Sequence, residues 1–131
     1  MKELLAQLQA VKMLALDWHY TASGPSFYAQ HLLADKVTEG FPLDELVETY
    51  YLGEKRTTPP KQAEIMADAI KLAEKNNGSP ALNVRELLKL ASAHAEELAR
   101  GNVSIGTKSL LDEVSQKCYV GIGLIERTVT E

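Results

Sequence analysis

The chain has 131 residues and a formal net charge of −4, with 45% hydrophobic and 24% charged residues. This length suits a single domain with a hydrophobic core. One cysteine excludes an intrachain disulfide and a multi-cysteine zinc site, and the acidic balance argues against DNA binding by a monomer. We find no secretory signal and no apolar run near the roughly 20 residues of a membrane span, so we expect a cytoplasmic protein without membrane contact.

Apolar residues at helical spacing predict helices along the whole chain. The first helix should cover residues 2–22 and end at Ser23-Gly24-Pro25, where glycine suits the end of one helix and proline the first turn of the next. The second helix should begin near Pro25 and break at residues 39–42, because Pro42 has no amide hydrogen to donate. It should then restart and close at Gly53.

A third, shorter helix is expected after residues 57–60, ending at residues 76–78. The apolar stripe of this helix is Ile65, Met66, Ala69, Ile70 and Ala73. Asn83 and Glu86 have the spacing of a capping box that would open a fourth helix, ending at Gly101.

The last helix should cover residues 106–128. Gly121 and Gly123 inside it each cost roughly 1 kcal/mol relative to alanine, so we expect close packing at both. Together the elements predict an all-α protein, one domain over residues 1–131. Four longer helices and one shorter middle helix favour an up-down bundle with one longer crossover.

Two histidines lie on either side of the first predicted turn. His19 precedes Gly24 by five residues and His31 follows Pro25 by six, so both should stand at nearly the same height. Asp35 shares a helix face with His31. Imidazole and carboxylate ligands together suit Fe(II), Mn(II) or Zn(II).

Ordinary structural interpretations of these residues also exist. A histidine near a helix end is more often a cap or a surface group than a ligand, and the Asp44–Glu48 pair at i, i+4 is usually a solvated face. We expect His94 to be a surface or packing residue and Cys118 to be a buried small hydrophobe.

The stretch HYTASGPSFYAQHLLAD, residues 19–35, resembles the ferroxidase segment of the mini-ferritins of the Dps family. The family pattern is His-Trp-Asn-x-x-Gly-x-x-Phe-x-x-x-His-x-x-x-Asp. The matching residues are His19, Gly24, Phe27, His31 and Asp35.

Two further segments carry the resemblance over nearly the whole chain. Asp44, Glu48 and Leu52-Gly53 are similar to the family's Asp-x-x-x-Glu followed by Leu-Gly, and GTKSLLDEV at residues 106–114 looks like its Gly-Thr-x-x-Leu-Leu segment. The resemblance implies a ferritin-like four-helix bundle with a short extra helix in the middle connection.

The resemblance also implies a function and an assembly. The chain would oxidise Fe(II) with oxygen or peroxide and store Fe(III) in a hollow homo-oligomer, a dodecamer built from homodimers. Histidines from one subunit and acids from its two-fold partner would bind iron between them. The implied ligands are His19, His31, Asp35, Asp44 and Glu48.

The chain departs from the family pattern in three places. Tyr20 stands where the family has tryptophan, and a Lys-rich N-terminal arm is missing, so we do not expect DNA binding. The stretch from His31 to Asp44 is about two residues short, and on an unbroken helix it would place Asp44 about 220° around from His31. Either the break at residues 40–42 resets this phase, or Glu39 and Glu45 replace the expected ligands.

Other functions remain to be weighed. No histidine follows a Glu-x-x-His pattern, so an iron site of the classical ferritin kind, inside one subunit, is not expected. A ferritin-like structural or nucleoid-associated oligomer without ferroxidase activity is one alternative. A small helical adaptor without any assembly is another.

Overall fold

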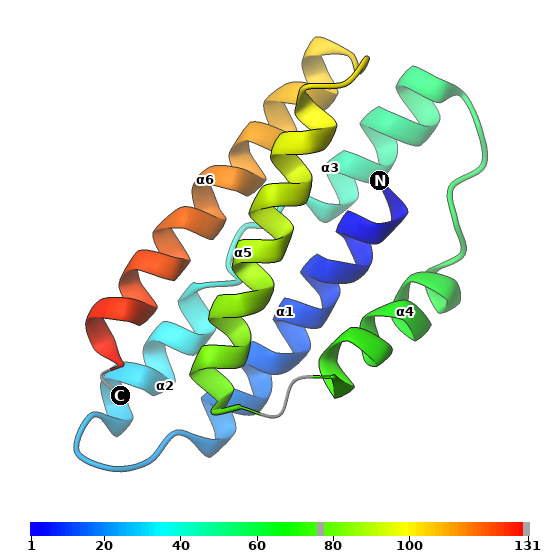
Figure 1. Ribbon diagram of the computed structural model, residues 1–131. Coiled ribbons are helices and arrows are strands. Elements are labelled where there is room, and N and C mark those ends of the chain that lie inside the picture. Colours follow the sequence, from blue (N-terminus) through cyan, green and yellow to red (C-terminus); the bar gives the residue numbers. More distant parts are fainter. Residues whose placement is uncertain (76–77, 130–131) are drawn as a thin grey trace.

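The computed structural model describes residues 1–75 and 78–129. All regular secondary structure in this part of the chain is helical and none of it is a strand, which confirms the all-α class (Figure 1). None of its helices is both long and apolar enough to cross a membrane. The elements are α1 (Lys2–Thr21), α2 (Phe27–Lys36), α3 (Leu43–Val47), the π-helix η1 (Glu48–Lys55), α4 (Gln62–Glu74), α5 (Pro80–Ala99) and α6 (Ile105–Thr128).

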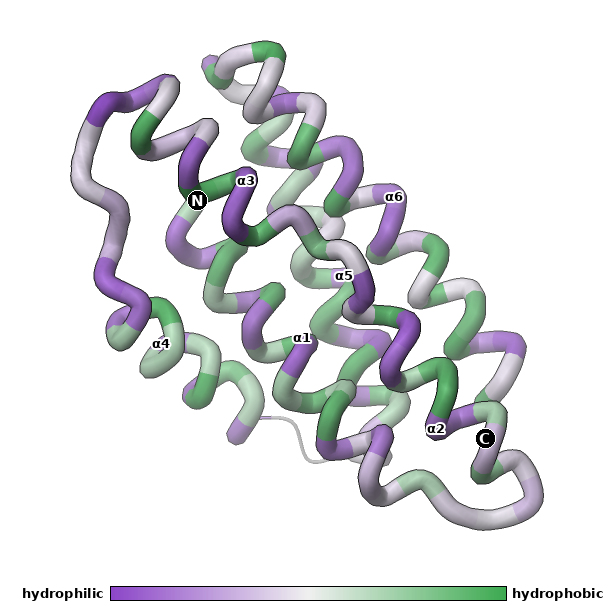
Figure 2. Tube along the Cα trace, turned by 180° about the vertical axis from the view of Figure 1, so that it is seen from behind, coloured by the Kyte–Doolittle hydropathy of each residue, from purple (hydrophilic) through white to green (hydrophobic). Residues whose placement is uncertain are grey.

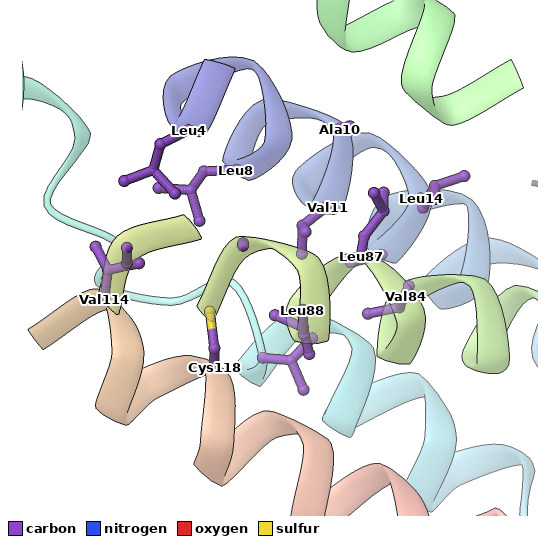
Figure 3. Close-up of a cluster of buried hydrophobic side chains, with 14 of the residues drawn as sticks. Leu4, Leu8, Ala10, Val11, Leu14, Val84, Leu87, Leu88, Val114 and Cys118 are labelled. Carbon is purple, nitrogen blue, oxygen red and sulfur yellow. The ribbon is translucent and has the colours of Figure 1, made fainter. Parts of the chain in front are cut away.

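The core lies between α1, α5 and α6. Figure 3 shows Leu8 and Val11 of α1 near Leu88 of α5, with Cys118 of α6 beneath them. All four side chains are fully buried. Cys118 is therefore the small core residue that the sequence predicts, and burial raises the pKa of its thiol to about 12. A thiol in this state is protonated and unreactive at neutral pH.

Helix α4 packs against α1 on the side away from α6 (Figure 1). Ile65 and Ala69 are buried there, as predicted, whereas Ile70 is exposed and its assignment to the stripe was wrong. The reason is that α4 has one main neighbour and buries a narrow strip. The helix ends at Glu74; of its predicted stop at residues 76–78, the two asparagines lie outside the described residues.

The predicted break after α2 is confirmed. Helix α2 ends at Lys36, Gly40 adopts a left-handed φ of +78°, and α3 begins after Pro42. The predicted close at Gly53 is wrong, because η1 continues in π-helical winding to Lys55 and ends at Arg56, which has a φ of 55°.

The predicted capping box at Asn83 is also wrong. Helix α5 begins earlier, with Ser79 as N-cap accepting a hydrogen bond from the Leu82 amide at 3.4 Å, and with Pro80 in the first position. Serine followed by proline is the stronger start signal. Asn83 instead accepts from the Gly78 amide at 3.1 Å and donates to the Gly78 carbonyl at 3.2 Å.

Gly121 and Gly123 of α6 have different surroundings. A Cβ at Gly121 would lie 3.0 Å from Leu88 Cδ1 and 3.6 Å from Val37, so α6 packs closely there, as expected. A Cβ at Gly123 would meet nothing within 4 Å, so the expectation of close packing was wrong at that position.

Candidate functional site

The two histidines face each other across the first turn. His19 lies in the last turn of α1 and His31 in α2, and their rings stack with centroids 3.7 Å apart and an interplanar angle of 19°. His19 Nδ1 lies 2.7 Å from the His31 carbonyl oxygen, and His31 Nδ1 lies 2.7 Å from the His19 carbonyl oxygen. The proximity inferred from spacing is confirmed, and the reciprocal pairing is a new feature.

These bonds determine which ring nitrogen carries the proton. A carbonyl oxygen only accepts hydrogen bonds, so Nδ1 of each ring must be the donor. In the neutral ring this leaves Nε2 with a free lone pair, the form in which histidine binds a metal ion. Within residues 1–75 and 78–129, neither ring makes another hydrogen bond. Both rings are therefore oriented in the way that metal-binding histidines usually are.

The same bonds have a structural role. Residue 19 is among the last four of α1, whose carbonyls lack an intrahelical partner, and His31 supplies one. Aromatic rings enclose the stack on both sides: Tyr20 lies edge-on to His19 and Phe27 lies against His31, each with ring centroids 5.4 Å apart. The pair is thus a helix-end cap as well as a candidate metal-binding group.

A second hydrogen-bonded link, which the sequence analysis did not find, lies beside the histidines. The indole Nε1 of Trp18 donates to Gln30 Oε1 at 3.0 Å, and Gln30 Nε2 donates to Ser26 Oγ at 2.7 Å. A buried tryptophan in an apolar stripe needs an acceptor for its N–H, and this was the available signal. The link joins α1 to α2 and so holds the two histidine backbones in register.

Asp35 lies in a groove of about 310 Å³ between α1 and α2. His19 lines the same groove, together with Gln9 and Lys12 of α1. Asp35 itself is exposed. The His19 imidazole and the Asp35 carboxylate therefore line the same surface groove.

Asp44 lines the neighbouring groove, of about 330 Å³, between α1, α3 and α4. Gln9 and Lys12 also line this second groove, so Asp35 and Asp44 flank the same strip of α1. The helix on which the 220° offset was calculated is thus interrupted between α2 and α3, so that offset does not apply. Glu39 lines a different groove, against α6.

Glu48 follows Asp44 by one helical turn and begins η1. A hydrogen bond with Asp44, then the charges of Asp44 and Glu45, raise the pKa of Glu48 above its usual range. All three carboxylates are exposed. A bound cation would relieve their repulsion, although an acidic exposed turn of this kind is also common without any ligand.

The five predicted ligands form two separate groups within one chain. His19 and His31 are in contact and Asp35 lines the same groove as His19, whereas Asp44 and Glu48 are neighbours of each other. No three His, Cys, Asp or Glu side chains converge on a common point within the described ranges.

The third histidine is a packing residue, as predicted. His94 of α5 pairs with the buried Gln7 of α1 through Nδ1 and Oε1, 3.1 Å apart. It joins two helices of the core and lies on α5, away from the α1–α2 turn.

No protein-family model matches this chain, and no curated protein or solved structure is significantly similar to it. The likeness to mini-ferritins therefore stands on the sequence motifs alone.

Proposed function

We propose that this chain is a mini-ferritin of the Dps kind that oxidises Fe(II) and stores the Fe(III) product in a hollow cytoplasmic homo-oligomer. The observation that carries the proposal is the reciprocal hydrogen bonding of His19 and His31, which leaves both Nε2 lone pairs free, while His19 and Asp35 line one groove. In this proposal α1, the broken α2–α3–η1 segment, α5 and α6 are the four parts of a ferritin-like bundle, and α4 is the short helix of the middle connection.

The proposed site is shared between two copies. His19 and His31 of one copy would face Asp44 and Glu48 of its two-fold partner, with Asp35 completing the ligand set. Grouped exposed apolar side chains are typical of protein interfaces. Such side chains surround the histidine pair: Leu16, Tyr20, Phe27, Tyr28 and Leu32 are all exposed.

The residues would act through placement and charge. Histidine and carboxylate ligands hold Fe(II) where an oxidant can reach it, and carboxylate charge stabilises the Fe(III) product. Two Fe(II) ions give one electron each to hydrogen peroxide, which takes up two protons and leaves as two water molecules. Oxygen is the alternative oxidant, and the family likeness favours twelve subunits.

Fe(II) titration tests the proposal. Anaerobic protein is mixed with Fe(II) and then peroxide, and Fe(III) formation is followed by near-ultraviolet absorbance. The wild type should oxidise iron much faster than buffer, and the double variant His31→Ala, Glu48→Ala should fall to the buffer rate. His94→Ala, the control, should keep the wild-type rate because its ring pairs with Gln7 in the core. A wild-type rate equal to that of buffer would contradict the proposal.

A second candidate is a ferritin-like structural oligomer without ferroxidase activity. The exposure of Asp44 and Glu48, with no third ligand beside them in the described part of one chain, favours it. Sedimentation velocity separates the cases: an inactive assembly supports this second candidate, whereas a monomer excludes both and leaves a small helical adaptor.

A further inference from the structure

A groove of about 520 Å³ lies between α2 and α6, and the proposed iron site does not use it. It shares no lining residue with the grooves of His19 and Asp44. Figure 2 shows α2 and α6 side by side with apolar segments on both. This volume falls within the range of small-molecule sites, about 300–1,000 Å³.

The floor of the groove is apolar. Val37 comes from the end of α2, and Val120 and Leu124 come from successive turns of α6. Val120 is 58% exposed although it is a large aliphatic residue. Gly121 lies between them, and the absence of a side chain there lets α6 approach Val37 and keeps the floor open.

Two ammonium groups lie at the rim, one from each helix. Lys36 belongs to α2 and Lys117 to α6, and neither forms an ion pair within residues 1–75 and 78–129. Lys117 Nζ leans over the α2–α3 connection, 3.0 Å from where a Cβ on Gly40 would lie. Glu39 is the one acid among the lining residues, so the rim carries a net charge of +1 from two lysines and one glutamate.

We propose that this groove binds a single-chain amphiphile with an anionic head, such as a medium-chain fatty carboxylate. The hydrocarbon chain would cover Val120 and Leu124, next to the buried Val37, where burial of apolar area supplies the affinity. The carboxylate would lie between Lys36 and Lys117, whose charges select an anionic head over a cationic one.

Equilibrium dialysis with radiolabelled dodecanoate, kept below its micelle concentration, tests the proposal on the intact protein without iron. We expect saturable binding of one molecule per chain. Dodecyltrimethylammonium, with the same chain length and the opposite charge, should bind at least tenfold more weakly. Absence of saturable dodecanoate binding, or equal affinity for the two amphiphiles, would overturn the proposal.

Matched variants locate the site. Lys36→Gln and Lys117→Gln should each weaken dodecanoate binding about threefold to tenfold, which corresponds to roughly 0.7–1.4 kcal/mol for the loss of one partly exposed charge. Lys108→Gln, an exposed lysine on the same helix, should leave affinity unchanged. Unchanged affinity in both groove lysine variants would overturn the assignment.

The floor is tested with an added charge. Val120→Glu should weaken binding more than tenfold, whereas Ile105→Glu, at an 89% exposed residue of the same helix, should not. Circular dichroism shows whether each variant is folded. Two results would point to other occupants and reject the proposal: dissociation of an oligomer by Val120→Glu in a protein that does not bind dodecanoate, or co-sedimentation with phosphatidylglycerol vesicles without binding of free dodecanoate.

Discussion

His19 and His31 are held by two mutual hydrogen bonds and by the stacking of their rings. Asp44 and Glu48, in contrast, are exposed carboxylates on one turn, and their negative charges repel each other. The first pair has its geometry before any ion arrives. The second pair is exposed, and a bound cation would offset the repulsion between its charges. One chain therefore supplies a preorganised half of the proposed site and a half that needs a partner.

The largest expected effect comes from separating the two halves. Leu16→Glu places a charge on a 49% exposed residue beside the histidine groove and should prevent the pairing of copies. Iron oxidation should then fall to the buffer rate although every proposed ligand is intact, and sedimentation velocity should show smaller species. Leu90→Glu, at a 46% exposed leucine on α5, is the control and should keep both assembly and activity. Full activity in a monomeric Leu16→Glu variant would place the whole site within one chain.

The next largest effect is expected at Gly121, where α6 packs against the end of α2, the helix that carries His31. Gly121→Ala places a methyl group 3.0 Å from Leu88 Cδ1 and 3.6 Å from Val37, which directly follows α2. Overpacking of this kind should lower the free energy of unfolding by about 1–3 kcal/mol in urea titrations. Gly123→Ala meets no neighbour and should instead raise it by up to about 1 kcal/mol through helix propensity. Equal effects at both positions would contradict the close approach of α6.

A smaller effect is expected from the hydrogen-bonded link of Trp18, Gln30 and Ser26, which holds the two histidine backbones in register. Gln30→Ala removes the acceptor of the buried Trp18 indole and should lower the free energy of unfolding by about 1 kcal/mol. The emission of Trp18, the sole tryptophan, should shift because its N–H loses its partner. Gln30→Glu keeps an acceptor oxygen and should retain most of the stability. A fully stable Gln30→Ala variant would show that the stacked rings alone hold the turn.

The smallest expected effects are changes of stability with pH, which should have opposite signs for Glu48 and Glu54, near the two ends of η1. The Asp44 hydrogen bond raises the pKa of Glu48, so the stabilising contribution of Glu48 is present at pH below its usual pKa and is lost as pH rises through the raised value. The free energy of unfolding of Glu48→Gln, relative to wild type, should therefore increase between about pH 4 and pH 7.

Glu54 should behave in the opposite way. The Ser104 amide at 2.9 Å and the Thr107 hydroxyl at 2.8 Å donate to its carboxylate and lower its pKa. Its stabilising contribution is present above its usual pKa and is lost as pH falls through the lowered value. Glu54→Gln should be less stable than wild type at pH 7, with a difference that shrinks in acid. Parallel pH dependences for the two variants in urea unfolding would contradict this contrast.

The sequence predicts local features better than relative positions. Gly40 and Pro42 predict the break after α2 because each constrains its own backbone. The predicted start of α5 was wrong because two N-cap signals, Ser79-Pro80 and Asn83, lie within five residues of each other, and Ser79-Pro80 is the stronger one. Ile70 was misplaced because the width of a buried stripe depends on how many helices lie against it.

At the candidate site too, the sequence predicts local features better than the relative positions of elements. Equal distances from the turn predict that His19 and His31 are neighbours, but the mutual bonds to backbone carbonyls depend on the angle between α1 and α2. In the proposed site, the histidines would meet Asp44 and Glu48 of a second copy of the chain. The spacing of residues along one chain reveals neither the angle between two helices nor contacts with a second molecule.

The π-helical winding of η1 makes this segment sensitive to its length. Its hydrogen bonds span five residues instead of four, so the same axial height contains an additional residue compared with an α-helix. Deleting one residue between Thr49 and Gly53 would let the segment adopt ordinary α-winding over nearly the same height, and the Glu54 carboxylate would keep its position at the first turn of α6. Inserting one residue would instead lengthen the segment and displace Glu54 from the Ser104 amide and the Thr107 hydroxyl, so an insertion here would disturb a helix that begins some fifty positions later in the chain.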